Sequence, residues 1–256
     1  MKAYFDLPAP RVIAHRGLAI AAPENTALAF MHALAIGVRY LETDVHASSD
    51  GEAMISHDPD LRRLAGRTAR IGDLTAAELS EVELGEGQRV LSLAAALDGF
   101  PDGRFNIDIK DPAAVEPTVR AVLEAKAIDR VLITSFDEGR RAAAVERLPG
   151  VATSASARRF VPALLSGHLG SDTLLRRALR GIDAVQIPER ALGLPTTGAR
   201  FIDRFHAIGV EVHIWTVNDP VRMAQLLGRG VDGLVTDRAD LAISQVARDI
   251  LPGNPL

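Results

Sequence analysis

The sequence contains no cysteine among its 256 residues. Disulfide bonds and thiolate-bound metals are therefore excluded, and so is a small secreted fold held together by disulfides. No apolar run approaches the roughly 20 residues that a membrane span requires, and the first eleven residues lack the apolar stretch of a signal peptide. We therefore expect a cytoplasmic protein without a membrane span.

A large excess of charge of either sign is also missing. Lys and Arg number 29 against 33 for Asp and Glu, which gives a formal net charge of −4. Proteins that bind nucleic acids normally carry a basic stripe, so we expect no nucleic-acid partner. Hydrophobic residues make up 47% of the chain, as is usual for a globular core. Nothing in the sequence indicates the oligomeric state.

Short apolar runs alternate with helical stretches along the chain, which predicts βα repeats and a parallel sheet. We expect eight principal strands, near residues 12, 41, 106, 132, 152, 185, 213 and 234. Eight is the number in a (β/α)8 TIM barrel, and we expect residues 1–256 to form one such domain. Residues from about 59 to 92 interrupt the alternation. We interpret them as a short insertion after the second strand, lying over the barrel mouth and too short to bury its own core.

Polar side chains follow or end several of the expected strands. In TIM barrels the active site forms at the carboxyl ends of the strands, so side chains from separate strands meet at one mouth. The main candidates are His15, Glu42, Asp44, Asp108, Lys110 and Trp215, and weaker ones are Ser135, Gln186 and Asp237. This convergence is the main argument from residue positions for an active site.

Glu42 and Asp44 are two residues apart on an expected strand, so both project from the same side. Two inward carboxylates repel each other unless a cation lies between them. Mg²⁺ or Ca²⁺ suits this site because both prefer oxygen ligands, and Asp108 can supply a third carboxylate. The alternative is a solvated, salt-bridged strand edge.

His15 and His57 are candidates for a general acid and a general base, since an imidazole titrates near neutral pH. Cleavage of a phosphodiester needs one proton removed from the nucleophile and one delivered to the leaving alkoxide. Arg16 and Lys110 can neutralise the phosphate oxygens. Trp215, the single tryptophan, either packs against a small polyol or belongs to the barrel rim.

The remaining polar candidates have simpler interpretations. His46 continues the alternation of Glu42 and Asp44, but it lies past the expected metal. We expect Asn25 or Thr26 to cap the first helix, although Asn25 can instead donate a hydrogen bond into the mouth. The other histidines, His32, His168, His206 and His213, are interpreted as structural.

Several motifs occur in the order known from one enzyme family. H-R-G at 15–17, P-E-N-T at 23–26, E-T-D-V-H at 42–46 and H-D at 57–58 resemble the glycerophosphodiester phosphodiesterases. N-I-D-I-K at 106–110, S-F at 135–136, W-T-V-N at 215–218 and T-D at 236–237 continue the resemblance, which covers nearly the whole chain.

This resemblance implies a TIM barrel that hydrolyses glycerophosphodiesters to an alcohol and glycerol 3-phosphate with a divalent cation. It implies that His15 and His57 are the catalytic pair, that Arg16 and Lys110 lie near the phosphate, and that Glu42 and Asp44 bind the metal. One departure is Asp108, which stands where the family usually has glutamate and is one methylene shorter.

Other functions are compatible with parts of the pattern. Sphingomyelinase D-type phospholipases share the two histidines and the carboxylates, but they are typically secreted and disulfide-bonded. A non-catalytic protein that binds a glycerophosphodiester is a second alternative. An amidohydrolase would need H-x-H on the first strand, where this chain has H-R-G. We therefore favour the phosphodiesterase.

Overall fold

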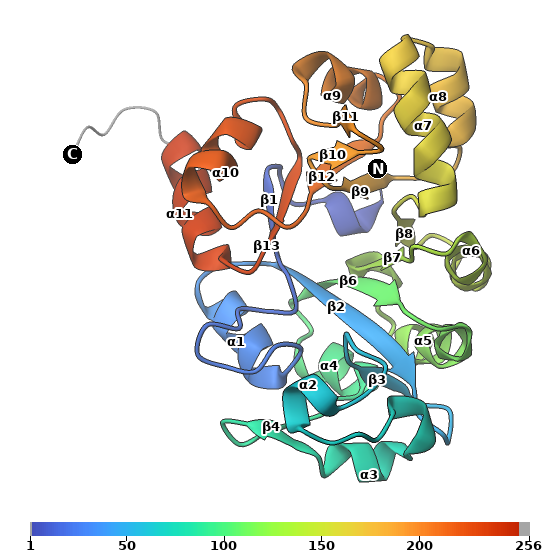
Figure 1. Cartoon of the computed structure of the whole chain (residues 1–256), viewed down its shortest axis with the longest axis vertical. Helices are drawn as coiled ribbons and strands as arrows, with labels where there is room; N and C mark the ends of the chain where they lie inside the picture. The colour runs from blue at the N-terminus through green and yellow to red at the C-terminus, as the bar shows by residue number, and fades with distance from the viewer. Residues whose placement is uncertain (1, 251–256) are drawn as a thin grey trace.

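A barrel of parallel strands forms the centre of the computed structural model, which describes residues 2–250 (Figure 1). The strand order is β8-β7-β6-β2-β1-β13-β12-β9, and a parallel bridge between Ser154 and Ala184 joins the two ends. The eight strands are β1 (Arg11–Ala14), β2 (Tyr40–Ala47), β6 (Arg104–Ile109), β7 (Val131–Thr134), β8 (Ala152–Thr153), β9 (Ala184–Ile187), β12 (Glu211–Ile214) and β13 (Gly233–Thr236). The predicted (β/α)8 barrel is confirmed.

Helices cover the outside of this barrel (Figure 1). They are α1 (Ala27–Ala35), α4 (Leu93–Gly99), α5 (Val115–Glu124), α6 (Glu138–Arg147), α7 (Ala157–Leu169), α8 (Asp172–Ala178), α9 (Ala199–His206), α10 (Pro220–Leu227) and α11 (Ala239–Ile250). Several begin at a Ser, Thr or Asp whose side chain accepts a hydrogen bond from the first turn, as Thr26 does from the Ala29 amide. Within residues 2–250, none of the helices combines the length and apolarity needed to cross a bilayer.

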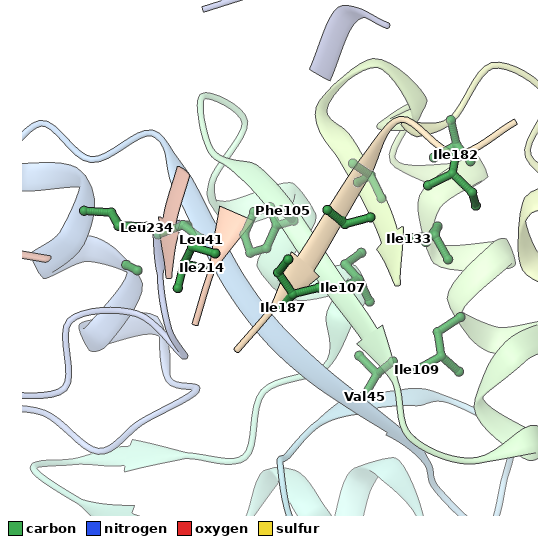
Figure 2. Close-up of a cluster of buried hydrophobic side chains, with 14 of the residues drawn as sticks. Leu41, Val45, Phe105, Ile107, Ile109, Ile133, Ile182, Ile187, Ile214 and Leu234 are labelled. Carbon is green, nitrogen blue, oxygen red and sulfur yellow. The ribbon is translucent and has the colours of Figure 1, made fainter. Parts of the chain in front are cut away.

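Alternation along the strands separates two sets of side chains. Leu41, Phe105 and Ile107 face outward and pack under the helices, together with Ile133 and Ile214 (Figure 2). Their sequence neighbours face into the barrel, which is why Glu42 and Asp44 on β2 point the same way. The outward set forms the main core, and the inward set supplies the polar groups of the mouth.

The amino-terminal end of the barrel is closed by apolar residues. Tyr4 and Phe5, in the short 3-10 helix η1 (Ala3–Phe5), pack against Ile13, Tyr40 and Val235. The Arg11 guanidinium donates to the Phe5 carbonyl at 2.9 Å, and Arg104 donates to the Ala3 carbonyl at 2.6 Å. With this end filled, the opposite end is left for a cavity.

The interruption after β2 forms a small lobe. It contains β3 (Ala53–Ile55), antiparallel to β2, then α2 (Arg62–Ala65), η2 (Ile71–Asp73), α3 (Ala76–Ser80), β4 (Glu83–Gly85) and β5 (Gln88–Arg89). Leu61, Ile71, Leu79 and Val82 pack together with Met54 in a separate buried cluster. The expectation that this segment buries no core of its own was therefore wrong, because Met54 from β3 anchors a local one.

Four further short elements connect the regular repeats. η3 (Pro112–Ala114) and η4 (Ile128–Arg130) precede α5 and β7. β10 (Arg190–Ala191) and β11 (Leu194–Pro195) form a hairpin after β9. The Ala191 side of this hairpin reaches the cavity at the barrel mouth.

Candidate active site

A cavity of about 410 Å³ lies at the carboxyl ends of the strands. All eight residues proposed from the sequence line it: His15, Arg16, Glu42, Asp44, His57, Asp108, Lys110 and Trp215. They come from four barrel strands or the loops that follow them, and from the loop after β3. The fold therefore brings the candidates together, while their individual roles stay predictions.

His15 is the first residue after β1. Its amide donates to the Thr236 carbonyl at 3.0 Å, which continues the pairing between β1 and β13. Its ring Nδ1 lies 2.6 Å from Asp237 Oδ1, and this hydrogen bond lowers the pKa of the Asp237 carboxyl. A carboxylate only accepts, so Nδ1 carries the proton and Nε2 is left for the cavity, 4.0 Å from Glu42 Oε2.

The H-R-G turn follows directly. Gly17 has φ +83°, and a Cβ there would lie 2.8 Å from backbone and side-chain carbons of Ala29, so glycine is required by both conformation and space. Arg16, also at positive φ, aims its amide at Glu42 Oε2 over 3.0 Å. Its guanidinium contacts Glu24 at 3.0 Å and lies 3.4 Å from Asp44. Arg16 therefore lies among carboxylates at the rim of the cavity.

Three carboxylates and one ammonium group form the floor of the site. Asp44 and Asp108 are register partners on β2 and β6, and Lys110 Nζ lies 2.7 Å from an oxygen of each. Burial alone would lower the pKa of Lys110, but the two carboxylates raise it above its ordinary value. Burial, reinforced by the charge of Asp44, raises the pKa of Glu42 well above its usual range.

Burial alone would raise the pKa of Asp44, but Lys110 and Arg16 hold it below its ordinary value. Burial raises the pKa of Asp108. The floor thus holds more negative charge than its single ammonium group balances. Proton uptake by Glu42 or a bound cation would relieve the imbalance.

The donor set fits a hard divalent cation. All three carboxylates supply oxygen ligands, Glu42 lacks a cationic side chain in direct contact, and the buried Asp108 Oδ1 has no hydrogen-bond partner. Within residues 2–250, however, no three acidic or histidine side chains are already arranged to hold a metal. Lys110 occupies the space between Asp44 and Asp108, so the three-ligand set stays a prediction.

His57 lies beyond the end of β3, which stops at Ile55. Its Nδ1 lies 2.8 Å from Asp58 Oδ1, and Asp58 Oδ2 accepts from Arg63 Nε at 2.6 Å. Burial alone would raise the pKa of Asp58, but His57 and Arg63 hold it below its ordinary value. His57 is thereby held as His15 is, with its own carboxylate at Nδ1.

Arg63 also forms ion pairs with Glu24, next to Arg16. Its two terminal nitrogens lie 2.9 and 2.6 Å from the oxygens of Glu24, which itself contacts Arg16. A continuous chain of ion pairs therefore links His57 to Arg16 through Asp58, Arg63 and Glu24. No role was predicted for these three residues from the sequence. The H-D and P-E-N-T motifs signalled two of them, and Arg63 had no signal beyond its charge.

We expect replacement of Arg63 by Gln to lower kcat by about tenfold, since Asp58 and Glu24 lose the cation that holds them, and misplacing a catalytic group is costly. The free energy of unfolding should change by less than about 1 kcal/mol, because Arg63 is half exposed.

Steady-state kinetics and thermal unfolding test this prediction, with Arg62→Gln on the same helix as the matched control. An Arg63→Gln enzyme with unchanged kcat, or one that loses activity only in proportion to folded protein, would contradict it.

Of the two residues expected to cap the first helix, Thr26 does so and Asn25 does not. Asn25 has φ +59°, so the helix begins only at Ala27, and Thr26 is the cap. The Asn25 side chain donates to Asp44 Oδ2 at 3.1 Å and accepts from Thr43 Oγ1 at 2.8 Å. It thus supports the floor of the site from below, which was the less favoured of its two interpretations.

His46 stays outside the active-site cavity. Its Nδ1 lies 2.9 Å from Asp111 Oδ2, and its Nε2 lies 3.3 Å from the His57 carbonyl. These contacts join β2 to the loops after β6 and β3, in keeping with a supporting position past the carboxylates.

One wall of the cavity is apolar. Trp215 meets Phe136 edge to face, with ring centroids 6.0 Å apart. Phe160 and Pro188 also line the cavity. Phe136 belongs to the S-F motif at 135–136, whereas Phe160 had no signal in the sequence, because its position at the mouth depends on how the chain folds after β8. An aromatic surface of this kind suits the carbon skeleton of a small polyol.

Comparison with known proteins identifies the family. Residues 15–241 match the glycerophosphoryl diester phosphodiesterase family. The chain belongs to this family. The motif resemblance is therefore confirmed, and the protein is an enzyme of the phosphoric diester hydrolase class.

Individual members of the family resemble the chain over nearly its full length. A probable glycerophosphodiester phosphodiesterase 2 of Mycobacterium tuberculosis is 42% identical over 93% of this chain and 89% of its own. A putative family structure from Silicibacter pomeroyi DSS-3 superposes with a TM-score of 0.80, covering 99% of this chain and 100% of that one at 22% identity. An Oleispira antarctica phosphodiesterase in complex with the product sn-glycerol-3-phosphate has a TM-score of 0.78 and 24% identity, covering 96% and 100%. The two structures support the barrel fold.

Proposed function

We propose that this phosphodiesterase hydrolyses glycerophosphodiesters to an alcohol and sn-glycerol 3-phosphate by acid–base catalysis from His15 and His57. One observation carries the proposal: both histidines line one cavity, and each has its Nδ1 held by a carboxylate, Asp237 or Asp58. Both Nε2 atoms are thereby left for proton transfer. The product found in the Oleispira antarctica relative agrees with this reaction.

The phosphate group is placed near Arg16 and Lys110, which neutralise its oxygens as negative charge develops. One imidazole takes the proton of the attacking oxygen at Nε2, and the other delivers a proton to the leaving alkoxide. The carboxylates at Nδ1 stabilise whichever ring becomes protonated. The glycerol carbons pack against Trp215 on the apolar wall.

A divalent cation, Mg²⁺ or Ca²⁺, completes the proposal. Glu42 and Asp44 would hold it, with Asp108 as a third ligand if Lys110 turns to the substrate. The bound ion supplies Lewis-acid polarisation of a phosphate oxygen. The chain's own contribution is to concentrate buried carboxylates at this point of the mouth. The ion pairs of Arg63 join the lobe after β2 to the barrel at this site.

Product analysis by ³¹P NMR tests this function. Incubation of the enzyme with glycerophosphocholine and Mg²⁺ or Ca²⁺ should replace the substrate resonance by that of sn-glycerol 3-phosphate, while choline leaves without phosphorus. A persistent cyclic phosphate would favour the internal attack of sphingomyelinase D-type enzymes. Saturable substrate binding without any new phosphorus resonance would support the non-catalytic alternative and overturn the proposal.

A further inference from the structure

A second cavity, of about 550 Å³, adjoins the active site on the side of the lobe after β2. It shares two lining residues, His57 and Lys110, with the first cavity. A phosphodiester has two arms that diverge from the phosphorus atom. Two cavities that meet at a catalytic histidine and a phosphate-binding lysine therefore offer one space for each arm.

The charged side chains that line the second cavity differ in whether they have hydrogen-bond or ion-pair partners. Asp111 accepts hydrogen bonds from the amides of Ala47 and Ala114 at 3.3 and 2.8 Å, and it also contacts His46. Lys110 is paired with Asp44 and Asp108. The one carboxylate that lines this cavity, Asp111, and its lysine, Lys110, therefore already have partners.

Arg70 is the exception. Its side chain is exposed and has no hydrogen-bond or ion-pair partner among residues 2–250. Its backbone is nonetheless fixed, because Arg70 forms a bridge with Asp60 and the next amide, that of Ile71, donates to the Pro59 carbonyl at 3.0 Å. A guanidinium on a fixed backbone, lining the same cavity as His57 and Lys110, is suited to bind an anionic oxygen group.

The residue types that line the second cavity disfavour the binding of a quaternary ammonium group there. Such groups are recognised by the faces of Phe, Tyr or Trp, and none of the described residues lining this cavity is of these types. Trp215 and Phe136 lie in the first cavity, where they suit the glycerol carbons. The second cavity is therefore the better place for the other alcohol.

We propose that the second cavity binds the leaving alcohol and that Arg70 selects alcohols with an additional anionic group, either a carboxylate or a phosphate monoester. This inference rests on the proposed hydrolysis of glycerophosphodiesters and specifies its substrate class. Arg70 is a specificity-determining residue in this arrangement, and His15 and His57 remain the catalytic pair.

Two matched pairs of substrates test the inference. Glycerophosphoserine differs from glycerophosphoethanolamine by one carboxylate, and glycerophosphoinositol phosphate differs from glycerophosphoinositol by one phosphate. The ratio of kcat/KM within each pair is measured for wild type, Arg70→Gln, Arg70→Glu and the exposed control Arg67→Gln. We expect the wild type to prefer the anionic member of at least one pair by about tenfold, mainly through KM, as for a charge-assisted hydrogen bond.

Arg70→Gln should bring that ratio close to one, Arg70→Glu should invert it, and Arg67→Gln should keep it. A ratio close to one in wild type for both pairs, or a preference that survives Arg70→Gln, would overturn the inference. If no substrate is turned over, the proposed function fails separately. Calorimetric binding of the same pairs then decides the role of Arg70, with loss of anion preference in Arg70→Gln still required.

Discussion

Replacement of His57 by Asn is expected to lower kcat for an unactivated glycerophosphodiester by about 10²–10⁴-fold, and His15→Asn by a similar factor, as for loss of a general acid or base. Each imidazole is held at Nδ1 by its own carboxylate and presents Nε2 to the shared cavity. Asparagine fills part of the space but transfers no proton. Combining the two replacements should cost much less than the product of the single losses, since the residues act as a unit.

An activated leaving group separates the two roles. Glycerophospho-p-nitrophenol needs no proton on departure, so the variant that lacks the general acid should regain most of its rate on this substrate. The variant that lacks the base should stay slow. His32→Asn, on α1 outside the cavity, is the control. Equal rescue of both variants, or losses below tenfold with a folded protein, would contradict an acid–base pair.

Replacement of Lys110 by Met is expected to lower the free energy of unfolding by about 3–5 kcal/mol, the usual cost of leaving a buried charge without its partner. Lys110 Nζ contacts both Asp44 and Asp108, and the side chains of these acids are only 2% and 8% exposed. Removal of the ammonium group leaves two adjacent carboxylates unbalanced. Turnover should fall as well, since the phosphate loses a cation.

Chemical denaturation measures this effect. Lys126→Met, at an exposed lysine, provides the control, and its change should stay within about 0.5 kcal/mol. Adding Asp108→Asn to Lys110→Met should restore part of the stability, because one of the two unpaired charges is then removed. If Lys110→Met is no less stable than Lys126→Met, the lysine does not hold the carboxylates together.

The strands and the inward direction of their polar residues were predictable from the sequence. Alternation with a period of two placed Glu42 and Asp44 on one side of β2, and the carboxyl-end rule placed His15 and Lys110 at the same mouth. These features depend on local pattern and on the closure of the barrel. The exact start of α1 was not predictable, since it depends on the positive φ of Asn25.

Contacts between loops were the main features that the sequence did not reveal. The bridge from Asp58 through Arg63 to Glu24 joins residues up to 39 positions apart. The position of Lys110 between Asp44 and Asp108 likewise depends on side-chain conformation after β6 has paired with β2. Charged loop residues have many possible partners in the sequence, and only the folded barrel selects among them.

The most direct test of the whole account is release of sn-glycerol 3-phosphate from a glycerophosphodiester under controlled metal content. Wild type, His15→Ala and Glu42→Ala are compared in EDTA and after addition of Mg²⁺ or Ca²⁺. We expect metal-dependent release by the wild type and almost none by either variant. Full activity in EDTA, or activity retained in folded Glu42→Ala, would contradict a cation held by this carboxylate cluster.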